Sequence, residues 1–155
     1  MKLVFTTAFL LCAVASAANA ETFTFKATSH NLNSINVATG ATTFVGAGFN
    51  EGESQTVYAS GQKTTTKNTC AGWSAPAGSP FTDEGVCTFT EGANDKASIV
   101  FSCVSDAKTG AGDCWGALRG VAGRNMGKTG TISWHQTNNA DGKTGTAAGT
   151  GMWND

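Results

Sequence analysis

Apolar and polar residues alternate along much of this chain from residue 21 onward. In Thr22-Phe23-Thr24-Phe25-Lys26 and in Thr131-Ile132-Ser133-Trp134, every second side chain is apolar. A period of two residues is typical of a β-strand with one buried face. An amphipathic helix needs long apolar residues at i, i+3, i+4 and i+7, whereas the chain after residue 20 holds only two leucines, Leu32 and Leu118. The pattern therefore predicts an all-β protein.

Turn signals divide this pattern into short strands. Asn50-Glu51-Gly52, Gly92-Ala93-Asn94-Asp95 and Asn139-Ala140-Asp141-Gly142 have the composition of tight turns between antiparallel strands. The segment 34–38 is a weaker strand candidate. The main predicted strands are 22–28, 42–49, 53–60, 62–69, 85–91, 97–103, 113–119, 129–137 and 144–153.

A meander of eight or nine short antiparallel strands must close or stack to bury its apolar face. We favour closure into a barrel, with a β-sandwich as the alternative. An eight-stranded barrel has an interior just wide enough for side chains or for one small ligand. If the chain closes, one alternate set of residues near its C-terminus lines the interior. That set is Gly130, Ile132, Trp134 and Gln136.

The first 20 residues have the features of a secretory signal peptide. Lys2 precedes an apolar run over 3–14, and Ala18-Asn19-Ala20 places small residues at the two positions that signal peptidase recognises. We expect cleavage between Ala20 and Glu21, a single domain over 21–155 and a secreted or periplasmic protein. The apolar run is shorter than the ~20 residues that a membrane span needs, so we predict no membrane span.

The chain has five cysteines, and four remain once the leader and its Cys12 are removed. An even number of cysteines in an exported chain indicates two disulfides. Close C-x-x-C pairs are lacking, so no zinc or other metal site is predicted. Four cysteines allow three pairings, and a fold about Asp95 would place Cys87 opposite Cys103. We favour pairs that each join neighbouring strands, namely Cys70 with Cys87 and Cys103 with Cys114.

The low charge of the chain and its incomplete sequence motifs argue against several classes of function. Charged residues are 14% of the chain and the net charge is −1, which argues against nucleic acid as a partner because Lys and Arg supply most of that affinity. Gly127-Lys128-Thr129 lacks the upstream glycine and the helix of a phosphate-binding loop. Ser105-Asp106-Ala107-Lys108 shares its lysine with a Lys-Thr-Gly that penicillin-recognising enzymes carry on a separate strand. We predict no cofactor, and no catalytic residue is singled out.

The sequence Gly-Lys-Thr-Gly-Thr occurs twice, at 127–131 and at 142–146. One interpretation is a duplicated ligand contact at one rim of the barrel. The other is that both copies lead from a turn into a strand, where Gly relaxes the backbone and Thr suits the pleat. We favour the second interpretation.

Four tryptophans are generous for a chain of this size. They either fill the core of a protein with few leucines or line a pocket, and both interpretations stay open. The candidate ligand-binding residues are Trp134, Trp115, Gln136 and Ile132.

Three segments carry a resemblance to known proteins. They are Gly85-Val86-Cys87-Thr88-Phe89, the acidic hairpin over 91–96 and the glycine-rich stretch over 120–130. In this order they resemble a group of small exported bacterial proteins of unassigned function. The glycine-rich stretch is also similar to G-G-T-G-x-[YF]-x-G-x-x-G of the allene oxide cyclase and dirigent-like barrels, although Ala122 replaces Thr and Asn125 replaces the aromatic. The matching glycines are Gly120, Gly123, Gly127 and Gly130. The resemblance implies an eight-stranded antiparallel barrel with a central cavity, and it carries over no catalytic residue.

Three functions follow as hypotheses of different classes. The leading one is an exported, disulfide-linked barrel that binds a small, largely apolar molecule without transforming it. A cyclase or isomerase, in which the cavity enforces a conformation of its substrate, is the alternative and would place Glu53, Glu91 or His135 inside the cavity. The third is a structural or surface-interaction protein with a packed interior and an exposed apolar patch. Oligomeric state is not predicted.

Overall fold

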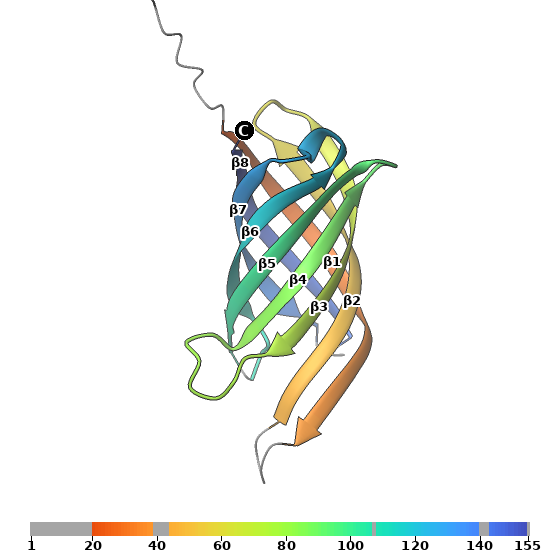
Figure 1. Ribbon diagram of the computed structural model, residues 1–155. Coiled ribbons are helices and arrows are strands. Elements are labelled where there is room, and N and C mark those ends of the chain that lie inside the picture. The colour runs from red at the N-terminus through yellow and green to blue at the C-terminus, as the bar shows by residue number, and fades with distance from the viewer. Residues whose placement is uncertain (1–19, 39–43, 107, 140–142, 155) are drawn as a thin grey trace, which may run out of the picture.

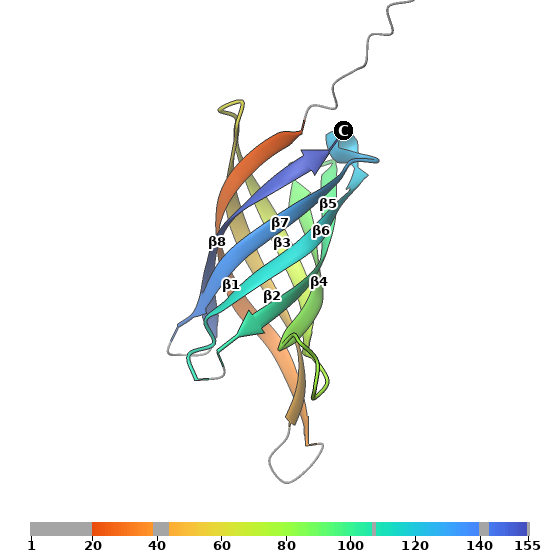
Figure 2. The ribbon, with the colours of Figure 1, turned by 90° about the vertical axis from the view of Figure 1, so that its left-hand side faces the viewer.

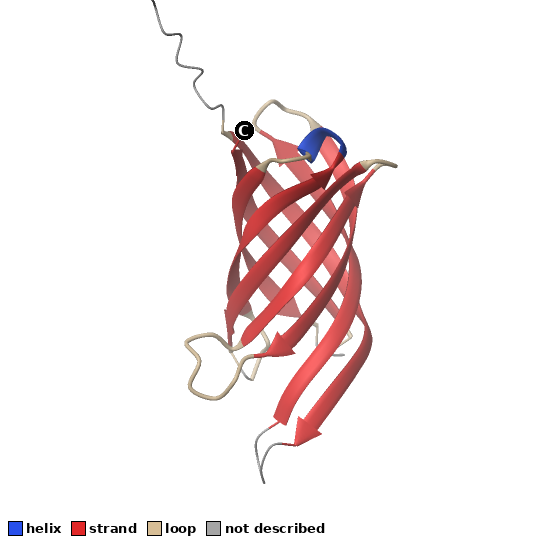
Figure 3. Ribbon diagram, viewed as in Figure 1, coloured by secondary structure: helices blue, strands red, loops and turns tan. Residues whose placement is uncertain are grey.

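The computed structural model describes residues 20–38, 44–106, 108–139 and 143–154. They form eight antiparallel strands that follow one another around a closed barrel, with β8 returning to pair with β1 (Figure 1). Within the described residues, the one helical element is a short 3-10 turn, η1, between β6 and β7 (Figure 3). The bounds are β1 Glu21–Ala38, β2 Phe44–Tyr58, β3 Lys63–Ser74, β4 Asp83–Glu91, β5 Asp95–Ser105, β6 Gly112–Ala122, η1 Gly123–Asn125, β7 Thr129–Asn138 and β8 Thr144–Asn154.

The predicted barrel is confirmed, but one predicted turn is wrong. Asn50-Glu51-Gly52 lies inside β2, so the two segments predicted at 42–49 and 53–60 belong to one strand. This strand pairs with β1 in an antiparallel ladder from Phe23↔Tyr58 onward, with one register shift at Asn31/Asn33. A Cβ at Gly52 would lie 2.2 Å from the carbonyl oxygen of Thr28. Gly52 therefore permits the backbones of β1 and β2 to approach closely. In the sequence alone, a glycine with this role cannot be distinguished from a glycine that forms a turn.

The hairpin of β1 and β2 extends beyond the rest of the barrel (Figures 1 and 2). β8 pairs with β1 as far as His30, whereas β1 and β2 continue to pair as far as Ala38 and Phe44. The weaker strand candidate at 34–38 is thus the end of β1. We call the end of the barrel that carries this hairpin the lower end, as it appears in Figure 1. The opposite end, with η1 and the β4–β5 hairpin, is the upper end.

Alternate residues of each strand face the barrel interior and build its core. The buried cluster consists of Phe23, Ala97, Ile99, Leu118, Ile132 and Trp153. Large side chains fit because glycines stand beside them: a Cβ at Gly151 would lie 2.2 Å from the ring of Phe23, and one at Gly116 would lie 2.6 Å from Cγ2 of Ile99. The chain has 20 glycines and few leucines. Its interior is therefore filled by aromatic and β-branched side chains that pack against the backbone of glycines.

Both favoured disulfides are confirmed. Cys70–Cys87 joins β3 to β4, and Cys103–Cys114 joins β5 to β6. In each case the two cysteines lie directly opposite one another in the strand register. Two disulfides fit an extracellular or periplasmic environment.

The expected leader falls almost wholly on residues 1–19, which lie outside the described residues, as does most of the predicted turn at 139–142. Among the residues that are described, no helix is long and apolar enough to cross a membrane. The first copy of the repeated sequence lies wholly within the described residues, and the second is described from Lys143 onward. Thr129 pairs with Asn154 while Gly145 pairs with Asn138, so the two copies begin their strands at opposite ends of the barrel. They form no duplicated contact at one rim.

Candidate ligand-binding cavity

The barrel interior contains a cavity of about 180 Å³, to which all eight strands contribute lining residues. Different polar residues line the two ends of the cavity. Tyr58, Glu91 and Asn125 line it at the upper end, and Ser29, Asn50 and Gln136 line it at the lower end. The walls between these ends also differ from one another, because one is apolar and the other is polar.

The apolar wall belongs mainly to β5, β6, β7 and β8. Ile99, Leu118 and Trp153 are 5% exposed or less, and each of them lines the cavity. The rings of Phe101 and Trp134 meet edge to face with centroids 5.4 Å apart. Aromatic pairs in this geometry add stability beyond the area that they bury, so this wall is a rigid apolar surface.

The polar wall belongs to β2 and β3. Ser54, Thr56 and Asn68 are between 4% and 8% exposed, and all three line the cavity. Within the described residues, no hydrogen bond is formed by the side chains of these three residues. Asn68 alone brings a carboxamide with two donors and an acceptor oxygen. Leaving such a group without a partner costs about 1–3 kcal/mol, so this wall is suited to a molecule that can hydrogen-bond to it.

A cluster of charged and aromatic side chains lies at the upper end. Arg124 of η1 forms ion pairs with Glu91 and Asp95, and its backbone N–H donates a 2.8 Å hydrogen bond to Oδ1 of Asp95. The guanidinium also lies over the ring of Tyr58. Tyr58, Glu91 and Asp95 all line the cavity, so Arg124 contacts three of the lining residues at its upper end.

The electrostatics of this cluster act on Tyr58. Burial raises the pKa of Tyr58 above its ordinary value, and the Glu91 carboxylate raises that pKa further. The Arg124 guanidinium and a hydrogen bond from Trp153 oppose the rise without cancelling it. Tyr58 is therefore a neutral hydrogen-bonding phenol at physiological pH.

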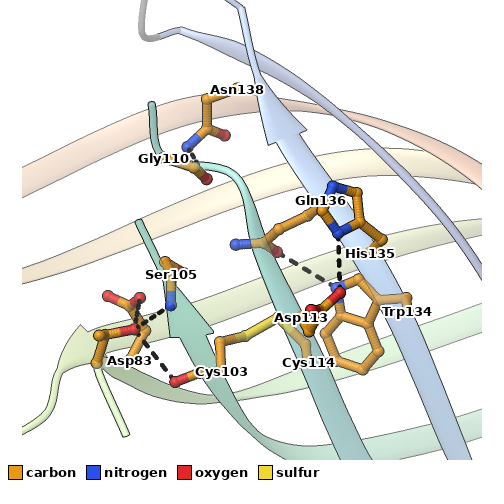
Figure 4. Close-up of a disulfide and its surroundings, with 11 residues drawn as sticks. Asp83, Cys103, Ser105, Gly110, Asp113, Cys114, Trp134, His135, Gln136 and Asn138 are labelled. Atoms are coloured by element: carbon orange, nitrogen blue, oxygen red, sulfur yellow. Dashed lines mark hydrogen bonds and ion pairs between the residues drawn. A yellow bond between two sulfur atoms is a disulfide. The ribbon is translucent and has the colours of Figure 1, made fainter. Parts of the chain in front are cut away.

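The lower end is lined by uncharged polar side chains. Ser29, Asn50 and Gln136 are half-buried there, and the neighbouring lining residues Ala27 and Ala147 are small. Nε1 of Trp134 donates a 3.3 Å hydrogen bond to Oε1 of Gln136, beside the Cys103–Cys114 disulfide (Figure 4). This hydrogen bond and the contact with Phe101 hold the Trp134 ring in the apolar wall.

The structure brings together three of the four predicted ligand-binding residues. Ile132, Trp134 and Gln136 line the cavity from β7, in the alternation that the sequence predicted. Trp115 does not join them, because it faces outward on β6, is 43% exposed and packs against the ring of Phe81. Cys114 carried a signal for the direction of Trp115. A cysteine that forms a disulfide inside the barrel requires the next residue of its strand to face outward.

Sequence reasoning missed the polar wall altogether. Asn68 lies in a stretch, 62–69, that is polar at every position, so alternation gives no contrast between the two faces of the strand. Ser54 and Thr56 were assigned to a strand, but nothing distinguished them from outward-facing hydroxyls. Only closure of the barrel reveals which hydroxyls and amides point inward.

The residues on which catalysis would depend are mostly outside the cavity. Glu53 is exposed on the outer face of β2. His135 also faces outward, where its Nδ1 lies 2.8 Å from Oδ1 of Asp113 (Figure 4). Glu91 does line the upper end, but Arg124 engages it. No group of three or more His, Cys, Asp or Glu residues that could hold a metal occurs in the described part of the chain.

Comparison of the chain with protein families, with curated proteins and with solved structures finds no match in any of the three. Its similarity to the allene oxide cyclase and dirigent-like barrels therefore stays a prediction. The barrel interior provides a small cavity with one apolar wall and a set of neutral hydrogen-bonding groups. These are the properties of a binding cavity.

Proposed function

We propose that this protein is an exported barrel that binds one small, largely apolar molecule in its interior and does not transform it. The observation that carries the proposal is the contrast between the two walls. An apolar surface that includes Ile99 and Trp134 faces the buried side chains of Ser54 and Asn68, which have no hydrogen-bonding partner among the described residues. The ligand supported best has an apolar body and one hydrogen-bonding group.

The size of the cavity limits the ligand. Drug-sized ligands occupy pockets of roughly 300–1,000 Å³, which is more than the 180 Å³ of this cavity. An apolar cavity of roughly 150 Å³ is known to take up benzene. A single-ring compound or a short branched aliphatic compound therefore fits, whereas a sterol or a long acyl chain does not.

Selectivity follows from the polar wall. An apolar molecule gains about 25 cal/mol for each Å² that it removes from water, but it leaves the amide of Asn68 without a partner. A molecule of the same shape with a hydroxyl or carbonyl group satisfies that amide and avoids a cost of about 1–3 kcal/mol. The cavity thus favours alcohols, phenols, ketones or amides over hydrocarbons.

Export through a leader cut between Ala20 and Glu21 is part of the same proposal. β1 begins at Glu21, which pairs with Trp153 of β8. A cut at this bond leaves every strand of the barrel complete. Both disulfides suit the oxidising compartment into which such a leader would deliver the chain.

Binding is favoured over catalysis because the carboxylates at the cavity already form ion pairs. The carboxylates that line the cavity, Glu91 and Asp95, are both engaged by Arg124 at the upper end. A general acid or base has to be within hydrogen-bond reach of the reacting group, and the apolar wall provides no such group.

A pair of neighbouring alanines tests the proposal. Ala147 lines the cavity while Ala148, the next residue of β8, is exposed on the outside. The protein is purified without denaturation and then examined by native mass spectrometry and ligand-observed NMR, alone and with a mixture of single-ring phenols, alcohols and ketones. We expect one molecule bound per chain in the wild type and in Ala148→Phe, and none in Ala147→Phe.

Unfolding curves recorded for both variants check that each remains folded. The proposal is wrong if the wild type binds no component at millimolar concentration. It is also wrong if folded Ala147→Phe binds as well as the wild type does, because the bound molecule would then lie elsewhere.

A further inference from the structure

A second hollow lies on the outer wall of the barrel. Four of its lining residues, Phe23, Tyr58, Phe101 and Ile132, also line the interior cavity. The hollow is a groove of about 950 Å³ that crosses six neighbouring strands, from β5 through β8 to β1 and β2. Figure 2 views the barrel from the side on which β6 and β7 lie in front. One row of outward side chains follows the hydrogen-bonding direction along the groove: Ser102, Trp115, Ser133, Thr150, Thr24 and Val57.

The groove is neutral along its whole length. None of the described residues that line it carries a charge. Ionisable side chains begin in the next row on one side, with Asp113, His135 and Lys26, and on the other side with Arg119. The lining combines the hydroxyls of serines and threonines with the apolar surfaces of Val100, Met152 and Trp115. This mixture suits neither an ion nor a purely hydrocarbon ligand.

Trp115 is the largest side chain of the groove and is held in place. It is 43% exposed, and the ring of Phe81 meets it edge to face at a centroid distance of 5.6 Å. Its register neighbours on either side are Ser102 and Ser133. A fixed indole flanked by hydroxyls offers an apolar ring face together with hydrogen-bonding groups. A neutral sugar ring is complementary to this surface. The C–H groups on the faces of the sugar ring can pack on the indole, and its hydroxyl groups can hydrogen-bond to the serines.

From these observations we infer that the outer groove binds a neutral oligosaccharide chain. Five strand spacings of about 4.8 Å give a groove roughly 24 Å long, which accommodates several sugar rings in succession. The wall needs no rearrangement, because all six strands are paired on both sides here, and a preformed surface lowers the entropic cost of binding. A peptide that binds by adding a strand needs a free sheet edge, and this part of the wall has none.

The chain provides a matched control for the indole. Trp73 on β3 is 42% exposed, almost the same as Trp115, but it lies outside the groove and donates a hydrogen bond to Glu84. Isothermal titration calorimetry compares the full chain with Trp115→Ala and Trp73→Ala. The probes are cellohexaose, maltohexaose and N-acetylchitohexaose, with hexagalacturonate as an anionic comparison. We expect at least one neutral probe to bind, about tenfold more weakly to Trp115→Ala, and equally well to Trp73→Ala.

Two further variants separate this site from the interior and from loss of fold. Ala147→Phe, which fills the interior cavity, leaves oligosaccharide binding unchanged, whereas Ser133→Lys places a charge in the groove and weakens it. The inference is overturned if no neutral probe binds at millimolar concentration, if only hexagalacturonate binds, or if both tryptophan variants behave alike. It is also overturned if sedimentation shows that Trp115→Ala turns a dimer into a monomer, because a second copy of the chain then occupies the groove.

Discussion

The guanidinium carbon of Arg124 lies 5.7 Å from the centroid of the Tyr58 ring. Arg124 and Tyr58 are far apart in the sequence, yet this contact joins η1 to the end of β2 while the same guanidinium holds Glu91 and Asp95 of the β4–β5 hairpin. The Arg124 side chain thereby connects η1, the end of β2 and the β4–β5 hairpin at the upper end of the cavity.

Tyr58 is the only tyrosine of the chain, so phenolate absorbance reports on this cluster alone. We expect Tyr58 in the folded protein to titrate above 10.0, because burial and Glu91 raise its pKa. Glu91→Gln removes a negative charge and should lower that pKa, whereas Arg124→Gln removes a positive charge and should raise it. A shift in the opposite direction in either variant would contradict this description of the upper end.

The same pKa sets the response of stability to alkaline pH. Above pH 10.0 the unfolded chain gives up its tyrosine proton before the folded chain does, so unfolding becomes more favourable as pH rises. The contribution of Tyr58 is fully present below pH 10.0 and is lost as pH rises through the pKa of the folded state. Urea unfolding between neutral and alkaline pH should therefore show a smaller alkaline loss in Tyr58→Phe than in the wild type.

Each disulfide should contribute a similar amount to stability. The bridged cysteines are 17 and 11 residues apart, and the loop-closure model gives about 3 kcal/mol at 25 °C for loops of this size. Replacing either pair by alanine should lower the free energy of unfolding in urea by about that amount. A loss below about 1 kcal/mol for one pair would show that its strands are held in register by their ladder alone.

The repeated sequence contains two equivalent glycines in different surroundings. A Cβ at Gly130 would lie 2.2 Å from the backbone oxygen of Met152, whereas one at Gly145 would lie 3.0 Å from Oδ1 of Asn138 and 3.1 Å from the backbone oxygen of Thr137. The contact at 2.2 Å requires the paired backbones of β7 and β8 to separate, but the contacts at Gly145 require only a small shift. Gly130→Ala should therefore destabilise the protein by about 1–3 kcal/mol and Gly145→Ala by clearly less. Equal melting temperatures would contradict this account.

Ile99 and Val100 test the inward and outward faces of β5. Ile99 is 2% exposed and lines the cavity, while its neighbour Val100 is 65% exposed. Ile99→Ala should lower the free energy of unfolding by about 2–5 kcal/mol, and Val100→Ala by no more than about 0.5 kcal/mol. Chemical denaturation of the two variants measures both values, and similar losses would mean that the faces of β5 are assigned incorrectly.

Much of the fold was predictable because its signals are local. Alternation in 129–137 placed Ile132 and Trp134 inside, and the cysteine spacing was compatible with the pairs that form. The turn predicted at Gly52 is wrong, because a glycine that lets two backbones approach and a glycine that makes a turn look alike in one sequence. The β1–β2 ladder, which only the closed structure reveals, decides between them.

The site was less predictable because it depends on contacts between distant segments. Arg124 and Glu91 are 33 residues apart, and nothing near either residue indicates that they meet at the end of a cavity. Asn68 carries a polar side chain into the interior, against the usual association of polar residues with the surface. Such a residue is found only when the direction of each strand is known.

The central claim is that the cavity holds a small molecule between an apolar wall and a hydrogen-bonding wall that includes Asn68. Calorimetric titration of p-cresol and p-xylene tests it most directly, because the two molecules have nearly the same shape and differ by a hydroxyl in place of a methyl group. We predict that the wild type prefers p-cresol and that Asn68→Leu shifts the preference toward p-xylene. Failure of both compounds to bind, or the same preference in both proteins, would contradict the claim.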